Sequence, residues 1–92
     1  MARARLHAFI EGEVQMVGFR GFAAERAYAL RLTGWVRNTR DGRVEVVAEG
    51  EQLDLRTFLD YLRQGPRAAR VTGVEEKWDE PTNEYSRFSV KG

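Results

Sequence analysis

The 92-residue sequence predicts an α+β fold in which two helices cover one face of a mostly antiparallel sheet of four to five strands. Three observations lead to this prediction. Strand-like and helix-like hydrophobic periods follow one another in the order β-α-β-β-α-β, with one further strand pattern at the end. An Asp-Gly pair separates the second and third strand patterns, and a Gly-Pro pair ends the second helix pattern. This order is typical of the ferredoxin-like, split βαβ arrangement.

The first third of the chain contains a strand, a loop and a helix. Residues 6–13 alternate with a period of two, which is typical of a strand. Residues 12–18 contain two glycines and no helical period, and therefore form a loop. From about Phe19 the apolar residues recur at helical spacing, so a helix begins there. We expect Arg31 in its last turn and Thr33-Gly34 as its stop.

The middle of the chain predicts a hairpin followed by the second helix. Residues 35–38 and 44–48 have strand patterns, and Asp41-Gly42 between them is a strong hairpin signal. A second helix is expected from about residue 52 to residue 64, where leucine and phenylalanine recur at i, i+3, i+4 and i+7. Gly65-Pro66 ends this helix.

The last third predicts two more strands joined by a turn. Residues 70–78 return to a strand pattern, residues 81–83 form a turn, and residues 85–90 form a last short strand. No linker, repeat or low-complexity tract interrupts the chain, so we expect residues 1–92 to form a single domain. A domain of this size hides only about 60–65% of its unfolded surface, which is enough for one compact core.

Composition restricts the chemistry. The chain has no Cys and one His, and its 15 basic and 14 acidic residues leave a net charge of +1. These counts exclude thiol catalysis, disulfides and metal sites built from Cys or several His. The small net charge argues against a general nucleic-acid or membrane-surface role. No stretch approaches a membrane span or a signal peptide, so we expect a cytoplasmic protein.

The loop before the first helix is the most informative segment. A helix N-terminus presents backbone N–H groups without intrahelical partners, and the helix dipole adds partial positive charge. Such a place suits a phosphate or a carboxylate. Arg20 falls in or just before the first turn, where the dipole disfavours a cation, so an anion between Arg20 and the N–H groups would explain its position. The alternative is a solvated surface arginine.

Other polar residues give weaker signals by pattern alone. Asn38 ends a strand beside the hairpin, where turn chemistry is the simplest explanation. His7 has no carboxylate or nucleophile at a suitable local spacing, so we expect a surface or half-buried strand position. Glu11 and Glu13 are expected on a solvated strand face rather than as a catalytic carboxylate pair.

Two separated motifs resemble those of one known family. Residues 14–20 read V-Q-M-V-G-F-R, and residues 34–42 read G-W-V-R-N-T-R-D-G. They resemble the acylphosphatase patterns V-Q-G-V-G-F-R and G-W-V-x-N-x-x-D-G, and the resemblance extends over essentially the whole chain. One departure is Met16, where the family has Gly. If that position requires a positive φ, Met carries strain that Gly does not. If φ is negative there, Met costs little and projects a flexible side chain near the site.

The resemblance implies hydrolysis of the carboxyl-phosphate anhydride of small acyl phosphates to a carboxylate and inorganic phosphate. It implies no cofactor and no metal, and a monomer is the simplest expectation. By the same resemblance, Arg20 and a loop of backbone N–H groups hold the phosphoryl group, and Asn38 orients the attacking water. The residues assigned to this loop are Gln15, Met16, Val17, Gly18 and Phe19.

Three other classes of function share this fold or this element order. The first is a non-catalytic module of the same fold that binds an acyl or carbamoyl phosphate within a larger assembly. The second is RNA binding, because RNA-recognition domains share the element order, but residues 44–49 contain no aromatic side chain and two acids. A metal-carrying chaperone of this fold would need a Cys pair, which the chain lacks. The sequence does not identify the natural acyl phosphate.

Overall fold

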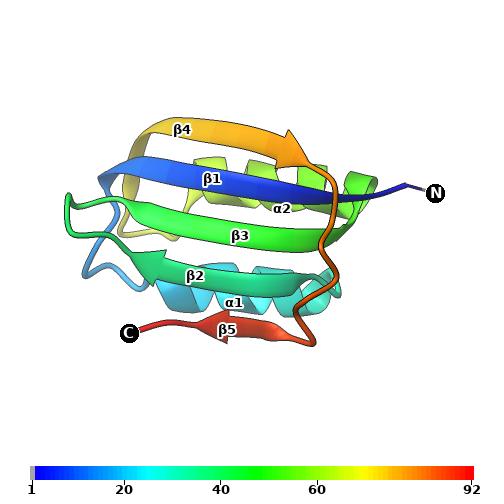
Figure 1. The fold of residues 1–92 in the computed structure, drawn as a ribbon. Coiled ribbons are helices and arrows are strands. Elements are labelled where there is room, and N and C mark those ends of the chain that lie inside the picture. The colour runs from blue at the N-terminus through cyan, green and yellow to red at the C-terminus, as the bar shows by residue number, and fades with distance from the viewer. Residues whose placement is uncertain (1) are drawn as a thin grey trace.

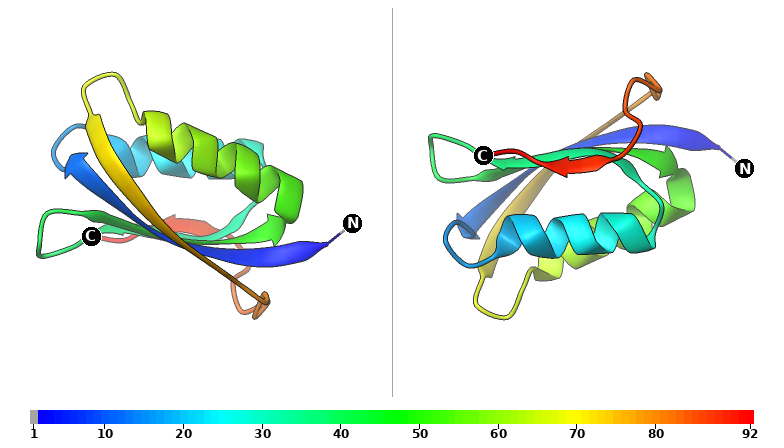
Figure 2. Two further views of the ribbon diagram at one scale, coloured as in Figure 1. Left: turned by 90° about the horizontal axis from the view of Figure 1, so that it is seen from above. Right: turned by 90° about the horizontal axis from the view of Figure 1, so that it is seen from below.

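The computed structural model describes residues 2–92 and confirms two helices on a mixed five-stranded sheet (Figure 1). The sheet order is β4-β1-β3-β2-β5, with antiparallel neighbours except for the parallel pair of β2 and β5. Both helices lie on one face of the sheet, as the two views of Figure 2 show. The elements in chain order are β1 (Arg3–Glu13), α1 (Phe19–Ala29), β2 (Thr33–Asn38), β3 (Val44–Glu51), α2 (Gln52–Gln64), β4 (Arg70–Asp79) and β5 (Phe88–Val90).

The core lies between the helices and the sheet. Alternate residues of β1 and β3 face the helices because successive strand side chains point to opposite faces. The Ala-rich face of α1 and the Leu- and Phe-rich face of α2 pack on them. The buried residues that form this layer include Leu6, Ala8, Ile10, Phe19, Ala23, Ala27, Val44, Val46, Ala48, Leu55, Phe58, Leu59 and Leu62. No helix within residues 2–92 has the length and apolar character needed to cross a membrane.

The opposite face of the sheet is crossed by the segment that joins β4 to β5 (Figure 1). Glu49 of β3 is fully buried there, and its carboxylate accepts hydrogen bonds from the backbone N–H groups of Thr82 (2.8 Å) and Asn83 (2.9 Å) and from the Arg5 guanidinium (3.1 Å). These bonds attach the connection between β4 and β5 to the sheet. Beyond them the chain reaches the edge formed by β2, and β5 pairs with β2 there.

Several predicted bounds differ from the structure. The first strand begins at Arg3 instead of Leu6, and β3 continues to Glu51 beyond the predicted end at Ala48. The expected last strand over residues 85–90 is shorter, since β5 covers only Phe88–Val90. The first helix ends at Ala29, and Arg31 lies beyond it with a left-handed φ of 58°. The Leu32 N–H donates to the Ala27 carbonyl oxygen (2.9 Å), which is the closing bond of a Schellman motif, so Thr33–Gly34 begins β2 instead of ending α1.

Candidate active site

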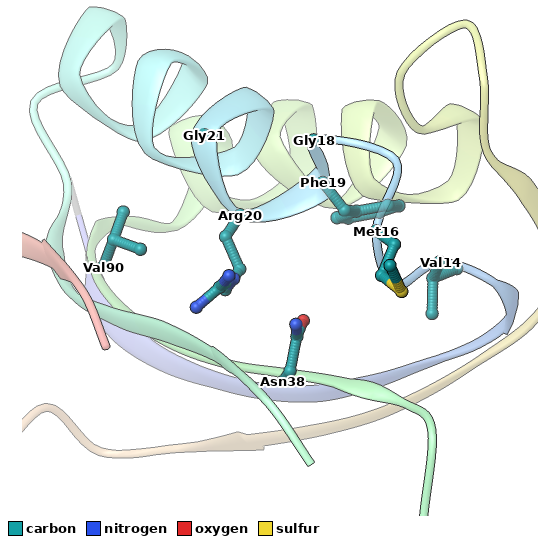
Figure 3. A pocket seen from close by; sticks show the side chains of 8 residues that line it. All are labelled: Val14, Met16, Gly18, Phe19, Arg20, Gly21, Asn38 and Val90. Atoms are coloured by element: carbon teal, nitrogen blue, oxygen red, sulfur yellow. The ribbon is translucent and has the colours of Figure 1, made fainter. Parts of the chain in front are cut away.

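A cavity of about 230 Å³ lies where the β1–α1 loop, the first turn of α1 and the ends of β2 and β5 meet (Figure 3). Three segments distant in the chain contribute to it because β2 is paired with β5 and packed against α1. The cavity is lined by Val14, Met16, Gly18, Phe19, Arg20, Gly21, Asn38 and Val90.

The loop is anchored in the core at both of its ends. A bulge in β1 at Gly12 turns the strand toward the loop, and a Cβ there would lie 2.1 Å from the Arg70 carbonyl oxygen, so only glycine fits. Val14 and Phe19 are 1% and 2% exposed. Because these two side chains are fixed in the core, residues 15–18 form an arch between two anchored ends, and Met16 and Gly18 of this arch are exposed.

The arch and the helix that follows present a row of free backbone donors. Gly18 is the N-cap of α1, with φ 79° and no side-chain cap, and the first turn contains no acidic residue. Within residues 2–92, no protein group accepts a hydrogen bond from the backbone N–H groups of residues 15–21; the series begins with Phe22, which donates to the Gly18 carbonyl oxygen (3.1 Å). Unpaired donors at a helix N-terminus favour an anion.

Met16 has a left-handed backbone, with φ 64°. This conformation costs a non-glycine residue on the order of 1 kcal/mol. Left-handed Met16 and Gly18 alternate with residues that are not left-handed, a pattern that turns successive N–H groups toward one side of the chain. The departure from glycine at position 16 therefore carries strain, while the loop keeps the geometry that a glycine there would favour.

Arg20 and Asn38 enter the cavity from opposite sides. Arg20 extends from the first turn of α1 and Asn38 from the last residue of β2, and the two side chains approach each other (Figure 3). The Arg20 Nη1 donates to the Lys91 carbonyl oxygen just after β5 (2.9 Å). This bond fixes the orientation of the guanidinium, and the chain end beyond β5 thus becomes part of the site.

The predicted site residues are only partly brought together. Met16, Gly18, Phe19, Arg20 and Asn38 line the cavity, as do three residues that sequence reasoning missed: Val14, Gly21 and Val90. Val14 is the first residue of the motif and Gly21 directly follows it, so both could have been inferred from the motif. Val90 had no local signal, because it reaches the cavity only through the parallel pairing of β5 with β2.

Gln15 and Val17 do not line the cavity. Val17 packs partly buried against the core. The Gln15 side chain turns toward the β2–β3 hairpin, where Nε2 donates to the carbonyl oxygens of Thr39 (2.8 Å) and Arg43 (2.9 Å). These two bonds tie the loop to the hairpin that follows Asn38. Only the backbone N–H groups of these residues remain available to a ligand.

His7 lies on the sheet face opposite the helices, because its neighbours Leu6 and Ala8 face the core. Its Nε2 is 2.7 Å from the Glu45 carboxylate, which also accepts a hydrogen bond from the Arg37 Nε (2.7 Å). The half-buried position of His7 agrees with the prediction from the sequence. Its partner Glu45 lies on the neighbouring strand and could not be inferred from the residues around His7. No group of three or more His, Cys, Asp or Glu side chains in residues 2–92 is placed to hold a metal ion.

An uncapped helix N-terminus beside an arginine is an arrangement that suits an oxyanion such as phosphate. The acylphosphatase family model matches residues 6–90, and the chain belongs to the acylphosphatase family. It is 44% identical to an acylphosphatase of Roseiflexus sp. over 98% of this chain and 97% of that protein. An acylphosphatase of Thermus thermophilus is 54% identical over 83% and 86% of the two chains.

The fold agrees with that of solved relatives. The crystal structure of the acylphosphatase from Bacillus subtilis matches with a TM-score of 0.93 at 34% sequence identity. The superposition covers 97% of this chain and 99% of that one.

The Asp41 carboxylate stabilises the hairpin beside Asn38. It accepts hydrogen bonds from the Thr39 hydroxyl and from the Arg43 Nε (3.0 Å), and these lower the pKa of Asp41 from 3.8 to about 2. Because the folded-state pKa is depressed, the stabilisation is complete above the unfolded pKa and is lost as the pH falls through about 2. An NMR titration of the side-chain carboxyl should show this low pKa.

The Thr39→Val variant tests the cause of this depression. Because the hydroxyl makes the largest contribution, its removal should raise the pKa of Asp41 toward 3.8. An unchanged titration in Thr39→Val, or an ordinary pKa in the unmodified protein, would contradict the hydrogen-bonded hairpin.

Proposed function

We propose that this protein hydrolyses the carboxyl-phosphate anhydride of small acyl phosphates to a carboxylate and inorganic phosphate. The observation that carries the proposal is the row of unpaired N–H groups over residues 15–21 beside Arg20, in a chain of the acylphosphatase family. Arg20 and four residues of this row, Met16, Gly18, Phe19 and Gly21, line one cavity of about 230 Å³, which has room for a phosphoryl group and a water molecule.

The phosphoryl group is held by the loop and by Arg20. A planar guanidinium donates to two oxygens of one phosphate at once. The backbone N–H groups of residues 15–19 and the positive end of the α1 dipole face the remaining oxygens. Since the loop is fixed at Val14 and Phe19 and tied to the hairpin by Gln15, these donors need little reorganisation as charge redistributes in the transition state.

Asn38 orients the attacking water. Its side-chain amide lies opposite Arg20 and is free to hold the water in line with the bond that breaks (Figure 3). The water oxygen forms a bond to phosphorus while the bond from phosphorus to the acyl oxygen breaks, and that electron pair leaves with the carboxylate. The proton of the water passes to the phosphate, because an amide is not a base at neutral pH.

The leaving group explains why the site contains no acid. A carboxylate has a conjugate-acid pKa of about 4, so it departs without being protonated. The positive charge that phosphoryl transfer requires comes from Arg20 and the N–H dipoles, so turnover is expected without a metal ion.

Phosphate release from acetyl phosphate and benzoyl phosphate tests the proposal, measured with and without EDTA. The protein should exceed the spontaneous rate equally in both conditions. Arg20→Lys keeps the charge but loses the two-pronged contact, so kcat/KM should fall by about 100-fold or more. Arg67→Lys, an exposed residue away from this cavity, is the matched control and should behave as the unmodified protein. Phosphate binding without turnover would instead support the non-catalytic module.

Asn38→Ala separates water positioning from phosphate binding. Loss of the amide should lower kcat by roughly 10- to 100-fold, because orientation of the nucleophile is lost. The inhibition constant for inorganic phosphate should change by less than about twofold, since the phosphoryl contacts remain. Asn83→Gly, in the β4–β5 connection and outside the cavity, removes the other asparagine side chain at a left-handed position (φ 59°) without backbone strain and is the control. An equal loss of phosphate affinity in Asn38→Ala would refute the assigned role.

A further inference from the structure

Two apolar side chains at the cavity are exposed to solvent. In the part of the chain that the structure describes, the exposed large apolar residues are Met16 (98%), Leu53 (67%), Tyr28 (62%) and Val90 (49%). Single exposed apolar residues are common on protein surfaces and need no explanation. Met16 and Val90, however, both line the same small cavity. Half of these residues thus gather where a substrate is expected.

The two side chains lie on opposite sides of the polar groups. Figure 3 shows Val90 beyond Arg20 and Met16 beyond Asn38, with the two polar side chains between them. Val90 is fixed by β5, and Met16 by the arch between Val14 and Phe19. The proposed phosphoryl site lies at the N-terminus of α1, between these two apolar residues. An acyl group attached to a phosphoryl group held there must lie toward the rim, between these apolar residues.

The backbone at Met16 adds a second argument. Its φ of 64° is one that glycine adopts without strain, yet the chain carries a long apolar side chain there. The side chain gains nothing from the core, because 98% of it is exposed. A thioether chain is flexible and adapts to apolar surfaces of different shape. Burying it against an apolar ligand would be favourable in proportion to the area removed from water.

We propose that Met16 and Val90 form an apolar subsite for the acyl group, so that the enzyme prefers acyl phosphates with an aryl or branched alkyl group over acetyl phosphate. This inference rests on the hydrolysis proposed above and assigns it a substrate class. The acyl group would cover both side chains, and each contact contributes to affinity in the transition state as well as in the bound substrate.

The test compares kcat/KM for benzoyl phosphate and acetyl phosphate, each divided by the spontaneous hydrolysis rate of that compound. The unmodified protein should favour benzoyl phosphate. Met16→Ala and the isosteric Val90→Thr should each lower the benzoyl-to-acetyl ratio by about fivefold, since each removes apolar contact with the ring. Leu53→Ala removes an exposed apolar side chain outside the cavity and is the matched control, with an unchanged ratio.

Met16→Gly separates the side chain from the backbone. Because Ala and Gly both lack the thioether, both variants should show the same ratio, and a fall in Met16→Gly alone would overturn the subsite in favour of a backbone effect. An unchanged ratio in Met16→Ala and Val90→Thr, with both compounds still hydrolysed, would also overturn the subsite while leaving the hydrolysis intact. No turnover of either compound by the unmodified protein would refute the hydrolysis itself and this inference with it.

Discussion

The N-terminus of α1 carries positive charge that no group within residues 2–92 neutralises. The helix begins without a side-chain cap or an acid in its first turn, and its second residue is Arg20. The helix dipole disfavours a cation in this position, so the arrangement is unfavourable until an anion lies between the guanidinium and the N–H groups. In the proposed function, the same features that cost stability in the free protein become favourable contacts with the phosphoryl group.

The rest of the fold holds these donors in place. The bulge at Gly12 sets the direction of the loop, and the buried side chains of Val14 and Phe19 fix its ends. Gln15 bonds the loop to the hairpin that follows Asn38, so the proposed phosphoryl donors and the amide proposed to orient the water are connected directly. The Lys91 carbonyl oxygen then orients Arg20 from the far edge of the sheet. Each contact joins segments that are distant in the sequence.

The sequence predicted those parts of the structure that depend on local signals. The Asp-Gly hairpin, the bounds of α2 and the start of α1 at Phe19 follow from turn chemistry and hydrophobic period, and the site motifs lie on them. Val90, the Arg20–Lys91 contact and the His7–Glu45 pair were not predictable, because strand order alone brings these residues together. The end of α1 was misplaced because Arg31 occupies a position where glycine is usual. The φ of Met16 depends on closure of the whole loop, and its only sequence signal was the glycine that the family pattern has at this position.

Titration of the ¹⁵N-labelled protein with inorganic phosphate, followed by ¹H–¹⁵N NMR, tests the central claim most directly, because each loop N–H group reports separately. The account predicts that the largest saturable shifts occur at the amides of residues 15–21 and at the guanidinium of Arg20. It also predicts that Arg20→Ala weakens the phosphate affinity while the shifts remain on the same amides. Saturable shifts centred elsewhere, such as around Arg26 and Arg67, or their absence from residues 15–21, would contradict it.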